Sequence, residues 1–262
     1  MMKAKEGVSV DSSVHNDIIH KIRQHQSIRK FTSEIVPEEH IRQIVASAQM
    51  ASTSSNMQAF SIIGVTDKEK KRVLAELAGN QAYIEECSHF LVFCADTHRL
   101  KHSAEQEGVD ITPALEHVEM FLVSTIDAAL AAQNAALASE ALGLGIVYIG
   151  GIRSRIAEVS EVLNLPDHVY PVFGMCIGYP DQSPGVKPRL PLEAVYFENE
   201  YQPFEQVKDK VAAYDQTMSQ YYEARTAGKR TDTWSEMMSR SLKDPKRTHL
   251  KDFLAERGFL LK

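Results

Sequence analysis

The feature that most constrains this chain of 262 residues is one long apolar stretch near its middle. Residues 114–142 predict a single helix of about 29 residues, which would be about 43 Å long at 1.5 Å per residue. In its second half, DAALAAQNAALASEALGLG, alanine and leucine occupy most of the circumference. A helix that is apolar on nearly all sides must be covered on most of them. We therefore expect it to run through the centre of the protein or along a subunit interface.

The overall composition predicts an ordinary globular protein. Apolar residues make up 44% of the chain and charged residues 24%, which is typical of proteins with one sizeable core. The formal net charge of −6 argues against nonspecific nucleic-acid binding, which requires a basic surface. No stretch reaches the roughly 20 consecutive apolar residues of a membrane span, and the start of the chain lacks the apolar region of a signal peptide. The three cysteines form no CxxC pair, so we expect reduced, buried thiols and a cytoplasmic protein.

Short apolar runs alternate with helical patterns along the rest of the chain, which predicts an α+β fold. Four runs predict strands, at residues 60–65, 90–95, 146–149 and 172–179. Ile18, Ile19 and Ile22 form the apolar stripe of a first predicted helix, which ends before Gln26. Helical patterns predict further helices after Pro37, after the N-cap Asp67, and at 207–225, 234–242 and 249–257. The prolines of residues 180–204 predict an extended, ordered arm. We expect a flexible leader at 1–13, a core with its arm at 14–204 and a helical C-terminal extension at 205–262.

Small polar and basic clusters follow the ends of several predicted elements. They lie at residues 25–29, 52–56, 79–81, 150–153 and 187–189. Each cluster alone is an ordinary loop. Together, their cations, hydroxyls and glycines suit a phosphorylated ligand with a polar heterocycle. The sequence has no HExxH, GxSxG, P-loop or GxGxxG motif, and we predict neither a metal site nor a catalytic side chain.

Five blocks of the sequence resemble the nitroreductase family and follow the family's order. They are HQSIRKFTSEIVPEEHIRQIVASAQMASTSSNMQAFSIIGVTD, GNQAYIEE, FLVFCAD, DAALAAQNAALASEALGLGIVYIGGIR and FGMCIGYPDQSPGVKPRLPLEAV. The resembling branch comprises NADPH-dependent, oxygen-insensitive nitroreductases and NADPH–FMN oxidoreductases, and YYEARTAGKRTDTWSEMMSR resembles its C-terminal extension. The resemblance covers roughly residues 15–262. It implies a mostly antiparallel sheet flanked by helices in an intertwined homodimer, with FMN bound at the subunit interface.

The resemblance also implies which residues meet the FMN. The phosphate end would be contacted by His25, Ser27, Lys187 and Arg189, and Gln26 stands where the family usually has arginine, which leaves a backbone contact there. Arg29 would lie beside the ribityl chain and the pyrimidine edge, where a cation stabilises negative charge on the reduced ring. The partner-side contacts would be Thr53, Ser54, Ser55 and Gln81. The segment under the ring system would be Tyr148, Ile149, Gly150, Gly151 and Arg153, with Gly150 and Arg29 tuning the flavin.

The predicted extension bears on the electron donor. Arg225 and Arg230 resemble the arginines that bind the 2′-phosphate of NADPH, for which bidentate guanidinium pairing is suited. The resemblance then implies a ping-pong, two-electron transfer of hydride from NADPH through FMN to nitroaromatics, quinones or free flavin. Two alternatives stay open at this point. One is a dedicated NADPH:FMN reductase that supplies reduced flavin, and the other is a flavin-binding protein without catalysis.

Overall fold

The computed structural model describes residues 17–259, and the predicted leader lies outside this range. The chain divides into two compact units. The first takes the chain up to Pro184 and again from His249 onward, and the second comprises Gly185–Thr248. This division differs from the expected boundary between residues 204 and 205, because both the arm and two of the C-terminal helices belong to the second unit.

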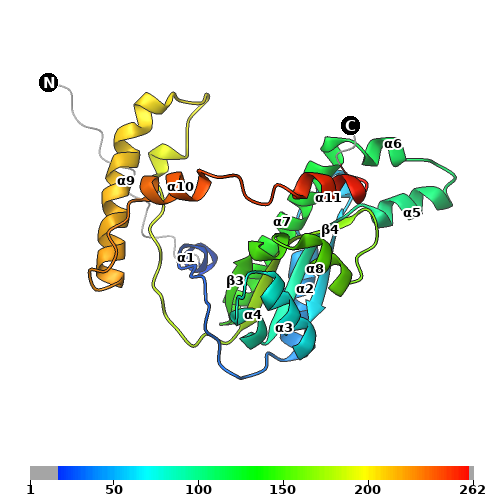
Figure 1. The fold of residues 1–262 in the computed structure, drawn as a ribbon, viewed down its shortest axis with the longest axis horizontal. Coiled ribbons are helices and arrows are strands. Elements are labelled where there is room, and N and C mark those ends of the chain that lie inside the picture. Colours follow the sequence, from blue (N-terminus) through cyan, green and yellow to red (C-terminus); the bar gives the residue numbers. More distant parts are fainter. Residues whose placement is uncertain (1–16, 260–262) are drawn as a thin grey trace. The chain divides into compact units, whose positions relative to one another are not determined.

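A four-stranded antiparallel sheet forms the centre of the first unit (Figure 1). Its strands are β1 (Phe60–Val65), β2 (His89–Asp96), β3 (Gly145–Ile149) and β4 (Val169–Gly178), in the order β1-β2-β4-β3. The four predicted strands are confirmed, and so is the antiparallel sheet. Successive side chains of β2 point to opposite faces, as the pleat requires. Leu91, Phe93 and Ala95 enter one core cluster, while Phe90, Val92 and Cys94 enter another.

Two helices, α2 (Glu38–Gln49) and α7 (Val118–Ala141), contribute to the first of these clusters. The prediction of one helix over residues 114–142 is wrong at its start. The chain first forms a short helix, α6 (Thr112–Leu115), and then breaks at His117, whose backbone is extended (φ −83°, ψ 149°). The long helix therefore has 24 residues.

The two sides of α7 differ in what covers them. Its alanines, such as Ala128, Ala131 and Ala135, are fully buried against the sheet. Along another side, Val118, Leu122, Ile126 and Leu130 recur every four residues and are each 44–54% exposed. By length and composition α7 could also cross a membrane, a property that it shares with core helices of globular proteins. One apolar stripe of this helix is thus uncovered within the single chain. A second exposed apolar set lies on α1 (Asp17–Arg23), where Ile18, Ile19 and Ile22 are about half exposed or more.

The opposite face of the sheet is covered mainly by α3 (Lys68–Leu77), with α4 (Tyr83–Glu86) and α8 (Ile156–Val162) beside it. The predicted N-cap is confirmed, since the Asp67 carboxylate accepts the backbone N–H of Lys70 at 2.8 Å. Gly79 follows the helix in the left-handed region (φ 92°), where glycine carries no steric penalty. The sequence analysis missed α5 (His98–Gln106), which buries no residue and so has no apolar stripe.

The chain returns to the first unit through α11 (Leu250–Glu256). Phe253, Leu254 and Phe259 join the same core cluster as α7. The second unit has its own small core of Tyr214, Met218 and Tyr222. That core is built on α9 (Phe204–Arg225), which follows the short turn η3 (Leu192–Ala194), and α10 (Trp234–Leu242) packs against it. The arm and the last three helices are therefore found close to where the sequence predicted them.

Candidate functional site

A glycine corner follows β3, where the chain enters the 3-10 turn η2 (Gly150–Arg153). A Cβ atom on Gly151 would lie less than 3.0 Å from the Ala78 carbonyl oxygen and from Gln81 Nε2. The corner therefore packs directly on the residues that follow α3. Gln81 is fixed there, because its Nε2 donates to the Ala78 carbonyl at 2.6 Å and its Oε1 accepts from the Tyr83 hydroxyl.

This packing adds a contact to the sequence interpretation. Gln81 is expected among the partner-side contacts to the flavin, and its side chain also lies against Gly151 of its own chain. The sequence separation of 70 residues between them hides the contact, which arises because α3 and β3 end at the same edge of the first unit. Whether either residue touches a cofactor stays a prediction.

Tyr148 and Arg153 tie the two ends of the corner to β4. The Tyr148 ring meets the Phe173 ring edge-on at a centroid distance of 5.2 Å, and burial raises the pKa of its phenol, which keeps the hydroxyl protonated. Arg153 donates to the carbonyl oxygen of Val172. Ile149 is buried between them. The corner is thus held by contacts to β4 of the sheet.

The segment 25–29 runs along β3 toward this corner. Ser27 forms a parallel bridge with Ile146, and the Ile28 N–H donates to the Ile146 carbonyl at 2.8 Å. The contact is close, because a Cβ on Gly145 would lie 2.7 Å from Ile28 Cγ1. Arg29 follows with an exposed side chain. The structure therefore brings two predicted clusters, residues 25–29 and 148–153, onto one edge of the sheet.

His25 has a partner that the sequence analysis did not predict. Its Nδ1 lies 2.6 Å from Glu140 Oε1, and the two side chains are 30% and 14% exposed. The carboxylate fixes the orientation of the imidazole and engages Nδ1, so Nε2 is the ring atom that could meet a phosphate. Glu140 could have been found as the only acid in the last three turns of an otherwise apolar helix.

A pocket of about 360 Å³ opens beside this pair. It is lined by Lys21, Gln24, Gln26, Ile28, Glu140, Gly143, Leu144, Gly145, Pro180, Gln182 and Ser183. Gln26 is the only expected cofactor residue among them. Gln26 has a neutral amide where the family usually has an arginine. The pocket is therefore lined by more uncharged hydrogen-bonding side chains than charged ones.

The hydroxyl cluster forms a loop that leads into β1 and contains the turn η1 (Ser54–Asn56). Thr53 Oγ1 accepts the Gln58 N–H at 3.3 Å, while the side chains of Ser54 and Ser55 are exposed. The loop is held from outside by α7, whose Asp127 accepts the backbone N–H groups of Ser54 and Ala59.

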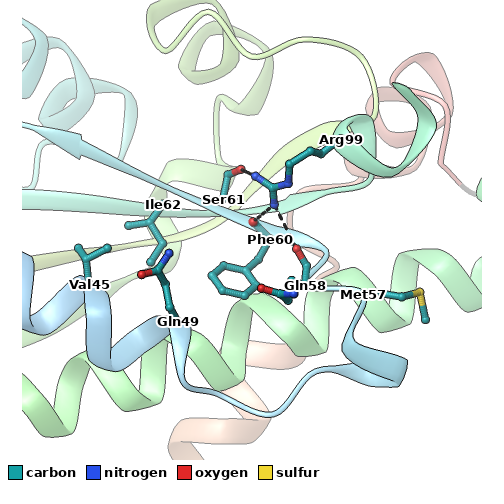
Figure 2. A pocket seen from close by; sticks show the side chains of 8 residues that line it. All are labelled: Val45, Gln49, Met57, Gln58, Phe60, Ser61, Ile62 and Arg99. Carbon is teal, nitrogen blue, oxygen red and sulfur yellow. Dashed lines mark hydrogen bonds between the residues drawn. The ribbon is translucent and has the colours of Figure 1, made fainter. Parts of the chain in front are cut away.

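A pocket of about 400 Å³ lies on the other side of this loop, between α2, the loop and β1 (Figure 2). Arg99 of α5 crosses its edge and donates to the carbonyl oxygens of Gln58 (3.1 Å) and Phe60 (2.7 Å). The remaining lining residues are Val45, Gln49, Met57, Ser61 and Ile62. None of the expected cofactor residues lines this pocket, and the main contribution of Arg99 is to hold the end of the loop.

Two of the expected phosphate-binding cations of the second unit contact the same aromatic ring. Lys187 Nζ lies 5.7 Å from the centroid of the Tyr222 ring, and Arg230 Cζ lies 4.4 Å from the same centroid. Arg189 donates to the Lys187 carbonyl at 2.7 Å. Cation–π contact of this kind restricts long basic side chains. Tyr222 thereby packs beside a cation expected at FMN and one expected at NADPH, a role that no sequence motif indicated.

Arg230 is also held by a carboxylate. Its Nε donates to Asp232 Oδ2 at 2.8 Å, and Arg240 donates to the other oxygen. These two arginines, Arg240 first, lower the pKa of Asp232. Arg230 binds Asp232 through Nε, so its terminal nitrogens, Nη1 and Nη2, are the donors that would face a phosphate. Arg225 is oriented separately, with Nη1 donating to the Tyr221 hydroxyl at 2.5 Å.

The donor set fits FMN by its chemistry. In the first unit it comprises the exposed cation Arg29, the exposed hydroxyls of Ser54 and Ser55 and the glycine pair Gly150–Gly151, and in the second unit the exposed cations Lys187 and Arg189. The first unit, an antiparallel sheet covered by helices on both faces, carries Arg29 and the glycine pair on the side of its edge strand β3 and the hydroxyl loop before its other edge strand, β1. These features define an α+β protein with groups suited to a phosphorylated, flat heterocycle.

Comparison with known proteins gives the family. The model of the nitroreductase family matches residues 22–179, and that of the nitroreductase family C-terminal domain matches residues 187–262. The chain therefore belongs to the nitroreductase family.

Individual relatives cover almost the whole chain. An "FMN reductase (NADPH)" of Bacillus subtilis is 52% identical over 245 residues, which is 93% of this chain and 98% of the relative. An "Oxygen-insensitive NADPH nitroreductase" of Salmonella typhimurium is 41% identical, covering 90% of this chain and 95% of the relative. Among solved structures, NfrA1 of B. megaterium superimposes with a TM-score of 0.92 at 52% identity, covering 94% of this chain and 100% of that one. The predicted family and fold are confirmed.

Proposed function

We propose that this chain is an NADPH-dependent FMN oxidoreductase that works in the cytoplasm as a homodimer and reduces nitroaromatics, quinones or free flavin. Its relatives carry activities of this kind in their names, at 41% and 52% identity. The single observation that carries the proposal is the placement of His25–Arg29 along β3, which ends at the Gly150–Gly151 corner. Basic and hydroxyl groups there lie beside backbone that a flat ring can approach.

When bound, FMN supplies the two-electron hydride chemistry, and the protein supplies binding, orientation and charge. Ser27 and His25, oriented by Glu140, would hold the phosphate end together with Lys187 and Arg189. Arg29 places a permanent positive charge beside the ring system and favours states in which that ring is anionic. Gly150 and Gly151 contribute backbone N–H groups with no side chain to keep the ring away. No protein side chain is needed as a general acid or base in this arrangement.

The preference for NADPH would come from the second unit. Arg230 is fixed by Asp232 and by the Tyr222 ring, so little rotational freedom is lost when its guanidinium binds a phosphate. Arg225, the last residue of α9, adds a second guanidinium five positions before Arg230. NADH lacks the 2′-phosphate and would gain nothing from either residue.

The exposed apolar stripe of α7 supports the homodimer. Val118, Leu122, Ile126 and Leu130 form a row on a helix whose other side, with Ala128, Ala131 and Ala135, is buried. Exposed apolar rows of this length mark protein–protein contacts, and a twofold interface uses the same patch on both subunits. The three free, buried cysteines accord with a reducing compartment.

A visible spectrum of the purified protein under anaerobic conditions tests the proposal. We expect a flavin band near ~450 nm that is bleached rapidly by one equivalent of NADPH and slowly by NADH. Equal bleaching by NADPH and NADH would still identify a flavoenzyme, but it would show that Arg225 and Arg230 do not select the electron donor. Protein that shows no band, even after incubation with FMN, would contradict the proposed function.

The acceptor is tested separately by steady-state turnover. NADPH oxidation is measured with free FMN and with nitrofurazone at equal concentration. Turnover with FMN alone would identify a dedicated flavin reductase, the activity in the name of the B. subtilis relative. Turnover with both acceptors would identify one permissive site.

A further inference from the structure

The hydroxyl loop has a backbone that needs support from outside itself. Ser55 (φ 48°), Asn56 (φ 57°) and Gln58 (φ 51°) all lie in the left-handed region without being glycine. Each such residue costs stability and persists only where its surroundings fix it. Within the loop, Met57 N–H donates to the Ser54 carbonyl at 2.8 Å. The Asn56 N–H donates to the Thr53 carbonyl and the Gln58 N–H to Thr53 Oγ1, both at 3.3 Å. None of these bonds involves the amide N–H groups of Ser54 and Ala59, which lie at the two ends of the loop.

Asp127 holds both ends of this loop. The residue lies on α7 and is 1% exposed. Its Oδ1 accepts the Ser54 N–H at 3.2 Å, and its Oδ2 accepts the Ala59 N–H at 3.0 Å. A buried carboxylate is costly unless its oxygens are paired, and here each oxygen has one backbone donor. Ser54 opens the η1 turn and Ala59 ends the run of left-handed residues, so one side chain spans the loop from end to end.

A second group holds the loop by its carbonyl oxygens. Arg99 donates to the carbonyls of Gln58 and Phe60, on either side of the amide that Asp127 binds (Figure 2). The backbone at residues 58–60 is therefore held by an anion at its N–H and by a cation at its C=O groups. Charge-assisted hydrogen bonds of this type are stronger than those between neutral groups.

We propose that Asp127, assisted by Arg99, is a positioning residue that gives the loop carrying Thr53, Ser54 and Ser55 its FMN-binding shape before the cofactor arrives. This rests on the proposed function, in which those three hydroxyls meet FMN. A preformed loop loses less conformational freedom on binding, which increases affinity. The role is distinct from simple packing, because a carboxylate supplies two acceptors at this place and an isosteric amide supplies one.

The test compares Asp127→Asn with a matched variant on the same helix, Ser124→Ala. Asparagine keeps the volume but turns an NH₂ group toward one backbone N–H, so one of the two bonds is lost. Ser124 is fully buried and bonds only to its own helix, at the Met120 and Phe121 carbonyls. Its loss removes a buried hydroxyl from α7 without touching the loop.

Two readouts are measured for each variant. The first is residue-resolved hydrogen exchange of the Ser54 and Ala59 amides in apoprotein, which needs no cofactor. The second is the Kd of FMN from quenching of flavin fluorescence. For Asp127→Asn we expect exchange at these amides and the Kd each to rise about tenfold or more, while Ser124→Ala stays at wild-type values in both.

Several outcomes would overturn the proposal. Asp127→Asn with amide exchange equal to that of Ser124→Ala would show that the loop does not depend on the carboxylate. Faster exchange with an unchanged Kd would show that loop shape does not matter for FMN. If Asp127→Asn fails to fold, Arg99→Gln, a change at an exposed residue, replaces it in the test. The proposal requires that amide exchange and the Kd of FMN both rise in this variant, and unchanged values would overturn it. Wild-type protein that binds no FMN would contradict the proposed function itself. The exchange measurement on apoprotein would still show whether Asp127 holds the loop, so the two failures can be distinguished.

Discussion

Replacing Gly151 with alanine should damage the glycine corner, whereas the same change at Gly150 should not. A Cβ at position 151 would lie less than 3.0 Å from a backbone carbonyl oxygen and from Gln81 Nε2, although ordinary van der Waals contact begins near 3.4 Å. The Gln81 amide can rotate away, but the Ala78 carbonyl belongs to the end of α3 and can move only with the helix. At Gly150 the nearest atom is Arg153 Nη2 at 3.3 Å, the end of a flexible side chain.

The size of the effect follows from these contacts. Overpacking against a fixed group costs about 1–3 kcal/mol, and loss of the bond between Gln81 and the Ala78 carbonyl adds about 1 kcal/mol. We expect Gly151→Ala to lower the free energy of unfolding by about 2–4 kcal/mol, or the Tm by roughly 4–16 °C in a chain of this length. Neither glycine has a positive φ. Gly150→Ala should therefore be neutral or slightly stabilising, by up to about 1 kcal/mol.

Thermal and urea unfolding of both variants, with and without saturating FMN, measures this difference. The two cofactor conditions separate the stability of the chain from the stabilisation that a bound ligand adds. If Gly151→Ala unfolded at the same temperature as Gly150→Ala, the corner would not be packed on α3 as the structure has it.

Three further results are expected. Arg230→Ala should raise the KM for NADPH roughly 10- to 100-fold in steady-state assays and leave the KM for NADH unchanged. The neighbouring Lys229→Ala should change neither KM. A parallel rise in the KM for NADH in Arg230→Ala would contradict the phosphate role. Ile126→Glu should give a monomer in sedimentation velocity because it places a charge in the apolar stripe, whereas Ile35→Glu, at an exposed site outside the stripe, should leave a dimer. Burial lowers the pKa of His168 in the folded protein below the ordinary value of 6.5. As the pH falls, the imidazole is therefore protonated in the unfolded chain before it is protonated in the folded protein. The contribution of His168 to stability is complete above pH 6.5 and is lost as the pH falls below it. His168→Asn, which tolerates the local φ of 62°, should therefore lose less Tm between pH 7.5 and 5 than the wild type, and parallel curves would refute the assignment.

Local signals explain why much of the fold was predictable. The Asp67 cap marked the start of α3. The predicted bounds of α10 agree with those observed, and the structure shows that Thr233 and Glu236 form a capping box at its start. The strands were recognisable as short apolar runs because the sheet is covered on both faces. Where a helix has no buried side, as in α5, this signal is absent and the helix was missed.

The site was less predictable, because its supporting contacts join residues that lie far apart in the chain. The expected residues came from resemblance to a family, whereas Glu140, Asp127 and Tyr222 follow from the three-dimensional packing alone. Asp127 and Glu140 could be noticed in the sequence, since each is an acid within a helix made mostly of apolar residues. Such an acid is retained where the fold provides donors for it, but the sequence does not say which donors these are. The contact of Gln81 with Gly151 was not predictable for the same reason.

The return of the chain through α11 has a consequence for synthesis on the ribosome. Phe253, Leu254 and Phe259 complete the core that α7 and the sheet begin, yet the whole of the second unit is translated in between. The first unit thus waits, with part of its apolar interior open, until the residues that close it have left the exit tunnel. During that interval the nascent chain is a natural client for chaperones. A nonsense mutation anywhere within the second unit would therefore leave an unfinished core, even where it falls after Arg230 and removes neither that residue nor the arm.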